Sequence, residues 1–407
     1  MSRFETSVIS CVLNLPRPGW LCLLPVIVAV TAVGAGADEI ELSRQVAAMG
    51  TVLEMTVSAR DRGTALAASQ SLLEAVDAVE RRLSTWRESS ELSRFNRSVP
   101  GIEVGLSEEL AADLHEARRW WSATGGAFDP GAGSLVAVWD LRGRGRRPSD
   151  TELAAARAAA GLEYLVLISG AGARTAAGFA IEEGGFAKGV ALREAAAAAL
   201  AADASCVVMN FGGQIEVAGD CGEQWVEIAD PQKRSNSVAR ISLDSGSVAT
   251  SGNSERRLVV DGVELGHILD PLSGRPAPDW GAVTVVAADP VAADCLATAL
   301  YVMGPNRGAE WVNARTGIEA VFAEGSGVTT QLAATAGLRG RLVTSEGTVT
   351  YLARTSHRVS TTGGESRRPA ALVANRAPRS SATTTASPDS QQTQRILALR
   401  HPRHETR

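Results

Sequence analysis

The sequence has little lysine and few aromatic residues, and it lacks the motifs of several large enzyme classes. Only Lys188 and Lys233 are lysines among 40 basic residues, and the formal charge of −5 argues against a nucleic-acid-binding protein. No apolar run after the N-terminus reaches the ~18 residues of a membrane span. A phosphate-binding loop, the H-E-x-x-H and C-x-x-C patterns of zinc sites and the G-x-S-x-G serine motif are all absent. The composition that remains is that of an ordinary globular protein.

The N-terminal segment has the pattern of an export signal. Two arginines precede an apolar run, Leu21 to Val33, which is short for a bilayer span, and Ala35-Gly36-Ala37 offers a cleavage site. We therefore expect residues 1–37 to be a signal peptide and the mature chain to begin near Asp38. An uncleaved N-terminal anchor is the alternative.

The C-terminal segment, residues 356–407, differs in composition from the rest of the chain. It is rich in Ser, Thr, Pro and Arg and shows almost no apolar periodicity. Such material cannot bury a core, so we predict a disordered tail. The folded domain is accordingly expected at residues 38–355.

Removal of the signal peptide would leave three cysteines in the mature protein. Cys206 and Cys221 flank a predicted hairpin at 206–217, whose two ends would lie close together. If the protein enters an oxidising compartment, these two are the pair that we expect to form a disulfide, leaving Cys295 free.

The body of the chain alternates helix and strand patterns without a regular β-α-β order, which predicts an α+β fold. Helices are predicted at 64–83, 108–124, 149–160, 187–202 and 290–303. Strands are predicted at 49–57, 164–168, 206–217 as a hairpin, 225–229, 238–243, 258–260 and 283–287. The last helix has the clearest start, because Asp289 can cap it and Pro290 suits its first position.

Asp294 and Thr298 form the first candidate site. They are four residues apart on the predicted 290–303 helix, so a carboxylate and a hydroxyl share one face, where we expect the carboxylate to be exposed. Oxygen ligands of this kind suit Mg²⁺. The same pair is also common on solvated helix faces, so by itself it does not decide between the two interpretations.

Two further segments contain candidate functional residues. Residues 184–189 place two glycines and Lys188 at a helix start, where exposed N–H groups favour an anion such as phosphate. Residues 267–276 place His267 before a tight Asp-Pro and Ser-Gly turn. His267 is a candidate general base or a turn-capping residue, and Lys188 is a candidate phosphate ligand or an accident of composition.

Taken together, these segments resemble the ApbE-type FAD:protein FMN transferases, a family of flavin transferases. The resemblance covers about residues 49 to 325 and rests on the order and spacing of its motifs. These are Met49–Thr51, Leu83–Trp86, Ser93–Asn96, Gly126–Pro130, Leu135–Trp139, Phe186–Gly189, Asn210–Gly213, Ala249–Asn253, His267–Gly274, Asp294–Thr298 and Met303–Gly304.

The resemblance implies an ApbE-like fold, with mixed or antiparallel sheets flanked by helices in one large catalytic unit. It implies a Mg²⁺-dependent reaction in which a Thr or Ser hydroxyl of a target flavoprotein attacks FAD, FMN becomes attached and AMP is released. An FAD pyrophosphatase giving FMN and AMP, and a non-catalytic periplasmic FAD-binding protein, are the alternatives.

The resemblance also implies a partner and a location. The acceptor protein is expected to carry a D-G-x-[ST]-G-A-[ST] motif and to belong to a membrane redox complex, and no nucleic-acid partner is expected. The protein itself would be periplasmic, or associated with the outer face of the inner membrane.

The family's functional residues carry over to matching positions of this chain. Mg²⁺ would be held by Asp294, Thr298 and the backbone carbonyl of Gly185, and His267 would be the base that deprotonates the acceptor hydroxyl. FAD contacts would come from Met49, Trp86, Ala127, Phe128, Asp129, Glu182, Lys188 and Ile268. For Met49, Phe128 and Ile268, core packing is an equally simple interpretation.

Two positions depart from the family pattern. Glu182 stands where the family usually has Asp, so the acidic side chain is longer there. Arg193 stands where the family often has Asp, so a negative charge near the site is replaced by a positive one. Arg193 is otherwise read as part of a surface turn of its helix. Residues 244–250 partly echo the acceptor motif but lack two of its glycines, and we interpret them as scaffold.

Overall fold

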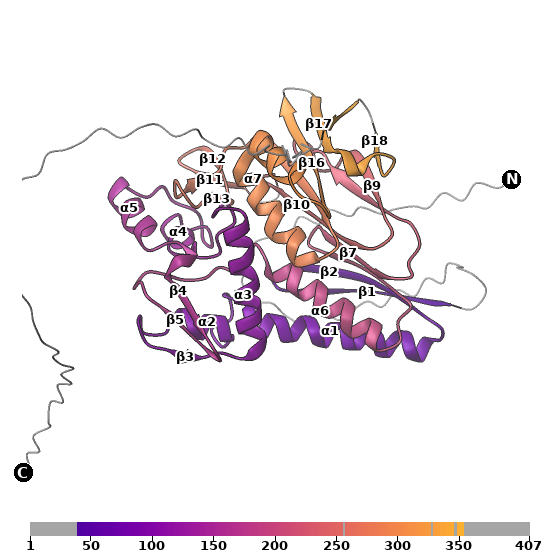
Figure 1. Ribbon diagram of the computed structural model, residues 1–407, viewed down its shortest axis with the longest axis horizontal. Coiled ribbons are helices and arrows are strands. Elements are labelled where there is room, and N and C mark those ends of the chain that lie inside the picture. Colours follow the sequence, from indigo (N-terminus) through magenta and orange to yellow (C-terminus); the bar gives the residue numbers. More distant parts are fainter. Residues whose placement is uncertain (1–38, 255–256, 327–328, 346–347, 354–407) are drawn as a thin grey trace, which may run out of the picture. The chain divides into compact units, whose positions relative to one another are not determined.

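The computed structural model describes residues 39–353, apart from 255–256, 327–328 and 346–347 (Figure 1). The expected signal peptide, residues 1–37, and the expected tail, residues 356–407, lie outside the described residues. Within the described part of the chain, no helix has both the length and the apolar character needed to span a membrane.

A nine-stranded sheet forms the centre of the fold, in the order β1-β2-β6-β7-β10-β15-β16-β17-β19. Neighbouring strands are antiparallel except for β17 and β19, which pair in parallel. The strands are β1 (Ile40–Ala48), β2 (Thr51–Ala59), β6 (Cys206–Phe211), β7 (Gln214–Gly219), β10 (Gly246–Gly252), β15 (Gly281–Ala287), β16 (Ile318–Ser326), β17 (Thr329–Thr335) and β19 (Val349–Leu352).

Three long helices cover one face of this sheet: α1 (Arg62–Leu83), α6 (Ala187–Ala201) and α7 (Pro290–Asn313) (Figure 1). Their apolar faces meet the sheet in two buried clusters: α1 contributes Leu72 and β2 contributes Val57 to the first, and α7 contributes Leu296 and β15 contributes Val283 to the second. The α7 segment is interrupted at Gly304, which has a φ of 76°, so its first straight part ends where the sequence pattern predicted.

A smaller sheet covers part of the opposite face, with the order β18-β9-β8. It consists of β18 (Leu342–Thr344), β9 (Ser237–Leu243) and β8 (Gln224–Ala229). Its buried residues, including Ile241, pack in one cluster with Val217, Val248 and Val321 of the main sheet. The main sheet therefore has a buried apolar cluster on each face.

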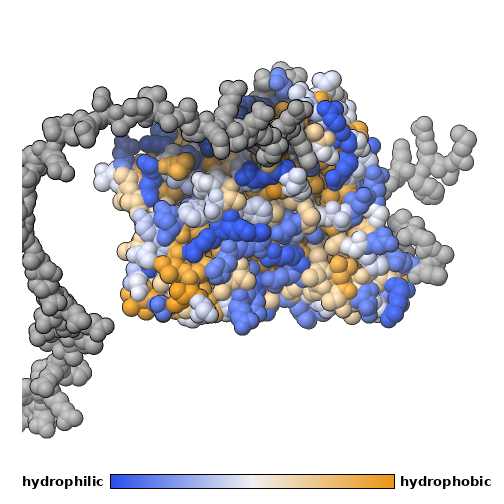
Figure 2. Space-filling view, in the orientation of Figure 1, coloured by the Kyte–Doolittle hydropathy of each residue, from blue (hydrophilic) through white to orange (hydrophobic). Residues whose placement is uncertain are grey.

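The remaining elements lie beside the helical layer, to the left in Figure 1. They are α2 (Glu91–Asn96), β3 (Val104–Gly105), α3 (Glu108–Ala123), α4 (Gly133–Val138), α5 (Asp150–Ala158), β4 (Leu165–Ile168), β5 (Ala171–Arg174), and the hairpins β11 (Arg257–Val260) with β12 (Val263–Gly266) and β13 (Leu269–Asp270) with β14 (Arg275–Pro276). Apolar surface gathers over β3–β5 at the lower left of Figure 2, and Val166 and Ile168 of β4 are exposed there.

The α+β expectation is confirmed, and the predicted helices agree with α1, α3, α5, α6 and the first part of α7 to within a few residues. The predicted 49–57 strand is wrong at its start. Met49 and Gly50 have φ values of 46° and 74°, so they form a tight turn that separates β2 from β1, a strand that the sequence analysis did not predict.

The predicted disulfide is present between Cys206 and Cys221. Cys206 begins β6 and Cys221 follows β7, so the antiparallel hairpin brings the two Cα atoms to 4.9 Å. Cys295 is buried and free, as expected.

Candidate active site

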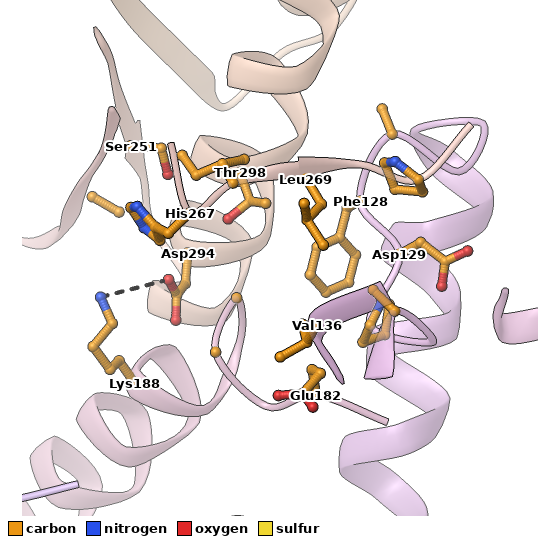
Figure 3. A pocket seen from close by; sticks show the side chains of 18 of the residues that line it. Phe128, Asp129, Val136, Glu182, Lys188, Ser251, His267, Leu269, Asp294 and Thr298 are labelled. Atoms are coloured by element: carbon orange, nitrogen blue, oxygen red, sulfur yellow. Dashed lines mark ion pairs between the residues drawn. The ribbon is translucent and has the colours of Figure 1, made fainter. Parts of the chain in front are cut away.

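A pocket opens where the starts of α6 and α7 meet loops from the rest of the fold (Figure 3). Ten of the expected site residues line it: Ala127, Phe128, Asp129, Glu182, Gly185, Lys188, His267, Ile268, Asp294 and Thr298. They come from four separate parts of the sequence. Only the tertiary structure could bring these segments together, and it does so for every expected metal ligand and the expected base.

Asp294 lies one helical turn from Thr298 on α7, which begins at the Asp289 cap. Contrary to the expectation of an exposed carboxylate, Asp294 is only 6% exposed. Its Oδ2 accepts a hydrogen bond of 3.1 Å from the Gly189 N–H, and its Oδ1 lies 4.0 Å from Nζ of Lys188. The carboxylate is buried because α6 crosses α7 at this point.

Gly189 makes that crossing possible. A Cβ at this position would lie 2.5 Å from the Pro290 carbonyl oxygen and 2.6 Å from the Cα of Val291. Both contacts are with backbone, which cannot move aside. A side chain at residue 189 would therefore push α6 away from α7 and from Asp294.

Gly185 lies at the same corner of the pocket. A Cβ built on Gly185 would be 3.3 Å from Oγ1 of Thr298 and 3.2 Å from Cε2 of Phe128. The three expected ligands thus come from α7 and from the loop that precedes α6, which meet here. The described residues contain no group of three or more His, Cys, Asp or Glu side chains arranged for a metal, so a cation at this corner would depend on backbone and hydroxyl oxygens beside one carboxylate.

The loop that carries Gly185 is fixed by residues of the Leu83–Trp86 and Ser93–Asn96 motifs. The Asn96 side chain exchanges two hydrogen bonds with the Ile181 backbone, at 2.8 and 2.9 Å. The Thr85 N–H donates to Oε1 of Glu183 at 3.1 Å. These motifs therefore act on the site indirectly, by holding the loop in place.

Glu182 lies in this loop and lines the pocket. Burial raises the pKa of its carboxyl to about 7, although Arg142 lowers it and Glu183 raises it further. The Arg142 Nη2 donates to Oε2 of Glu182 at 2.5 Å. The Glu that replaces the family's usual Asp at this position is therefore paired with an arginine.

His267 lies between β12 and β13 and is half-buried. Figure 3 shows its imidazole on the same side of the pocket as Asp294. The turn that follows is held by a hydrogen bond of 2.7 Å from Nε1 of Trp139 to the Gly274 carbonyl and by one of 2.8 Å from Gly274 N–H to the Asp270 carbonyl. Since Asp270 and Gly274 close the turn themselves, His267 is not needed for those bonds.

Asp129 lies on the other side of the pocket, away from Lys188 (Figure 3). Its two carboxylate oxygens accept hydrogen bonds from the Gly131 N–H at 2.7 Å, the Trp121 indole at 3.0 Å and the Leu162 N–H at 3.3 Å. Burial raises the pKa of Asp129 to about 6. These bonds give Asp129 a role in holding its loop, and a contact with FAD stays a prediction.

Two expected FAD-contacting residues, Met49 and Trp86, are not among the residues that line the pocket. Met49 lies in the turn between β1 and β2 and packs against the main core. Trp86 is 61% exposed, and the Arg142 guanidinium lies over its ring. Both remain predictions as FAD contacts.

Arg193 does not line the pocket either. It is paired with Glu116 at 2.7 Å and lies 3.7 Å from Asp289, at a partly exposed turn of α6. The surface interpretation of this departure from the family pattern therefore agrees with the structure.

Several residues that the structure brings to the site were not singled out from the sequence. Val136, Leu269 and Ser251 line the pocket, and all three were named only as parts of motifs. Arg142 was missed altogether. It belongs to an arginine-rich run, 142–147, in which nothing in the sequence distinguishes one arginine from the next.

Comparisons with known proteins show which family the chain resembles. Residues 49–322 match the model of the ApbE family. The FAD:protein FMN transferase of Vibrio cholerae is 30% identical over 302 residues, covering 71% of this chain and 89% of the relative. That of Klebsiella pneumoniae is 29% identical over 296 residues, covering 69% of this chain and 84% of the relative.

Solved structures show the same relationship. The ApbE protein of Thermotoga maritima has a TM-score of 0.65 and 28% identity, covering 75% of this chain and 97% of its own. The flavin transferase ApbE of Vibrio cholerae has a TM-score of 0.65 and 26% identity, covering 74% and 99%. Since the family match spans more than half of the sequence, the chain belongs to the ApbE family.

Proposed function

We propose that this protein transfers FMN from FAD to a Ser or Thr hydroxyl of an acceptor protein, with Mg²⁺ as cofactor and AMP as the second product. The observation that carries the proposal is the convergence of Gly185, Asp294 and Thr298 with Lys188 and His267 around one pocket. The names of the curated relatives support the transfer of FMN from FAD to a protein.

The residues at the α6–α7 corner fit Mg²⁺ by their chemistry. The Asp294 carboxylate, the Thr298 hydroxyl and the Gly185 carbonyl are oxygen donors, which is the donor type that this cation prefers. Mg²⁺ held there would supply positive charge against the diphosphate of FAD. Lys188 adds a further positive charge from the start of α6.

In the proposed reaction, the acceptor hydroxyl oxygen attacks the phosphorus on the riboflavin side of FAD. A new P–O bond joins FMN to the acceptor, the bond between the two phosphates breaks, and AMP departs with the bridging oxygen. The imidazole of His267 takes the hydroxyl proton. It must be neutral to do so, and we therefore expect transfer to fall at acidic pH.

We further propose that the protein is exported and acts in the periplasm or on the outer face of the inner membrane, with a redox-complex subunit as its acceptor. The disulfide between Cys206 and Cys221 supports an oxidising compartment. The signal-like residues 1–37 support the same conclusion. Mass spectrometry of the protein from the periplasmic fraction would test it, and a cytoplasmic protein with an intact N-terminus would contradict it.

The reaction is tested by incubating the protein with FAD, Mg²⁺ and a domain that carries the D-G-x-[ST]-G-A-[ST] motif. We expect mass spectrometry to find FMN added to the domain, and equimolar AMP in solution. The matched control is the same domain with the hydroxyl residues of the motif replaced by Ala, which should receive no FMN.

The other outcomes distinguish the alternatives. Free FMN and AMP in equal amounts, formed at the same rate with either domain, would make the protein an FAD pyrophosphatase. Tight FAD binding with no AMP would make it a binding protein.

A further inference from the structure

Arg142 connects two of the expected FAD-contacting residues, Trp86 and Glu182, from a third segment of the chain. Its Nη2 donates to Oε2 of Glu182 at 2.5 Å, and its guanidinium carbon lies 4.8 Å from the centroid of the Trp86 ring. Its Nη1 also donates to the Thr85 carbonyl at 2.9 Å, and Nη2 donates to Oγ1 of the same threonine. One guanidinium therefore ties the Leu83–Trp86 motif to the loop that carries Glu182.

A turn of the backbone at Asp140 fixes the position of Arg142. Asp140 has a φ of 51°, its carbonyl accepts from the Gly143 N–H at 3.0 Å, and its Oδ2 accepts from the Arg144 N–H at 3.1 Å. Leu141, the residue just before Arg142, is buried. Arg142 is half-buried, whereas Arg144 is exposed. The turn thus places Arg142, and not Arg144, next to the site.

The charge of Arg142 has a clear consequence for an anionic ligand. FAD carries a diphosphate, and three carboxylates, Asp129, Glu182 and Asp294, line the pocket that it would enter. Asp294 has Lys188 beside it, and Glu182 has Arg142. At a pH high enough to ionise Glu182, its carboxylate would, without Arg142, repel the ligand with no other ion-pair partner among the described residues.

The stacking of Arg142 has a second consequence. A guanidinium over an indole ring is attracted by the ring's electron density and restricts its rotation. It covers one face of the Trp86 ring, which is still 61% exposed. The ring is therefore held in place while a surface remains on which a planar group can stack.

We propose that Arg142 is a positioning residue for FAD: it offsets the charge of Glu182 and holds the Trp86 ring for stacking. This inference rests on the proposed function, because it requires FAD to contact Trp86 and Glu182. Arg142 makes no contact with a reacting atom in the proposed reaction. Its effect should therefore be on the binding of FAD and not on the chemical step.

The test compares Arg142→Gln with the wild type of the full chain. We expect the Kd for FAD, measured by calorimetry, and the KM for FAD to rise about tenfold, while kcat stays within about twofold. Arg142→Lys keeps the charge but not the planar fork, so it should recover part of the affinity.

Arg240→Gln is the matched control. Arg240 stacks on Trp225 at 4.5 Å on the small sheet, and neither residue lines the pocket. Its loss should leave both the Kd and the KM for FAD unchanged.

A second substitution isolates the charge effect. Measured at pH 9, above the pKa of Glu182, adding Glu182→Gln to Arg142→Gln removes the uncompensated carboxylate, and the double variant should bind FAD more tightly than Arg142→Gln alone. An unchanged Kd in Arg142→Gln, or a fall in kcat with KM unchanged, would overturn the inference. If the wild type itself binds no FAD, the proposed function fails instead.

Discussion

Glu216 should make the stability of this protein depend strongly on pH. It lies on β7 and is 5% exposed. Its side chain faces the helical layer, as does that of Gln214, which bonds the Pro290 carbonyl at the start of α7. Oε2 of Glu216 has no hydrogen-bond partner among the described residues. Burial raises the pKa of this carboxyl to about 8, although a hydrogen bond with Ser247 lowers it.

The direction of the pH effect on stability follows from which protonation state of Glu216 the folded protein prefers. The folded-state pKa of Glu216 is above the ordinary value of 4.5, so the folded protein binds the proton more tightly than the unfolded chain does. The stabilisation is fully present below about pH 4.5 and is lost as the pH rises through about 8. At about 1.4 kcal/mol per pH unit, the loss across this window reaches about 5 kcal/mol.

Glu216→Gln tests this, because the amide has nearly the shape of the protonated carboxyl and does not ionise. Urea unfolding of the wild type and the variant should be measured between pH 4.5 and pH 9. We expect the difference in free energy of unfolding, variant minus wild type, to rise by up to about 5 kcal/mol over this range. Glu54→Gln, at an exposed position of β2, is the matched control and should show no such gain.

Parallel pH profiles for the wild type and Glu216→Gln would refute the reasoning. They would mean that the carboxylate is solvated or paired in the folded protein, in spite of its burial. A gain of equal size in Glu54→Gln would also refute it, because the effect would then reflect net charge and not burial.

Three further predictions concern the site and the scaffold. His267→Ala should lower single-turnover FMN transfer at saturating FAD about 10²–10⁴-fold with little change in FAD affinity, whereas an unchanged rate with weaker binding would make His267 a scaffold residue. Asp294→Asn should abolish Mg²⁺-dependent AMP release while largely keeping the buried shape, and normal release would remove Asp294 from the metal site. Replacing Cys206 and Cys221 by Ser should lower the free energy of unfolding in urea by about 2–4 kcal/mol, and equal stability in oxidising buffer would count against a structural role for the bond.

Local chemistry was enough to predict much of the secondary structure. The spacing of apolar residues located α1 and α3, and the Asp289 cap with Pro290 located the start of α7. The hairpin at 206–217 predicted the disulfide, because an antiparallel pair brings its own ends together. These features depend on residues that are neighbours in sequence, so the sequence can reveal them.

The same local reasoning failed where the backbone conformation was unusual. Nothing in the apolar pattern of residues 49–57 indicates that Met49 adopts a positive φ, which is rare for a side chain of this size. The conformation is set by the pairing of β1 with β2, and β1 lies before the predicted strand.

For the site, the sequence by itself determined which residue types are present and in what order, and the order of the motifs indicated the family. Only the tertiary structure decided how they meet. Asp294 is buried because Gly189 lets α6 cross α7, and Arg142 reaches Glu182 because the turn at Asp140 directs it inward while Arg144 stays in solvent. Burial and pairing of charges depend on contacts between segments distant in sequence, which no local pattern records.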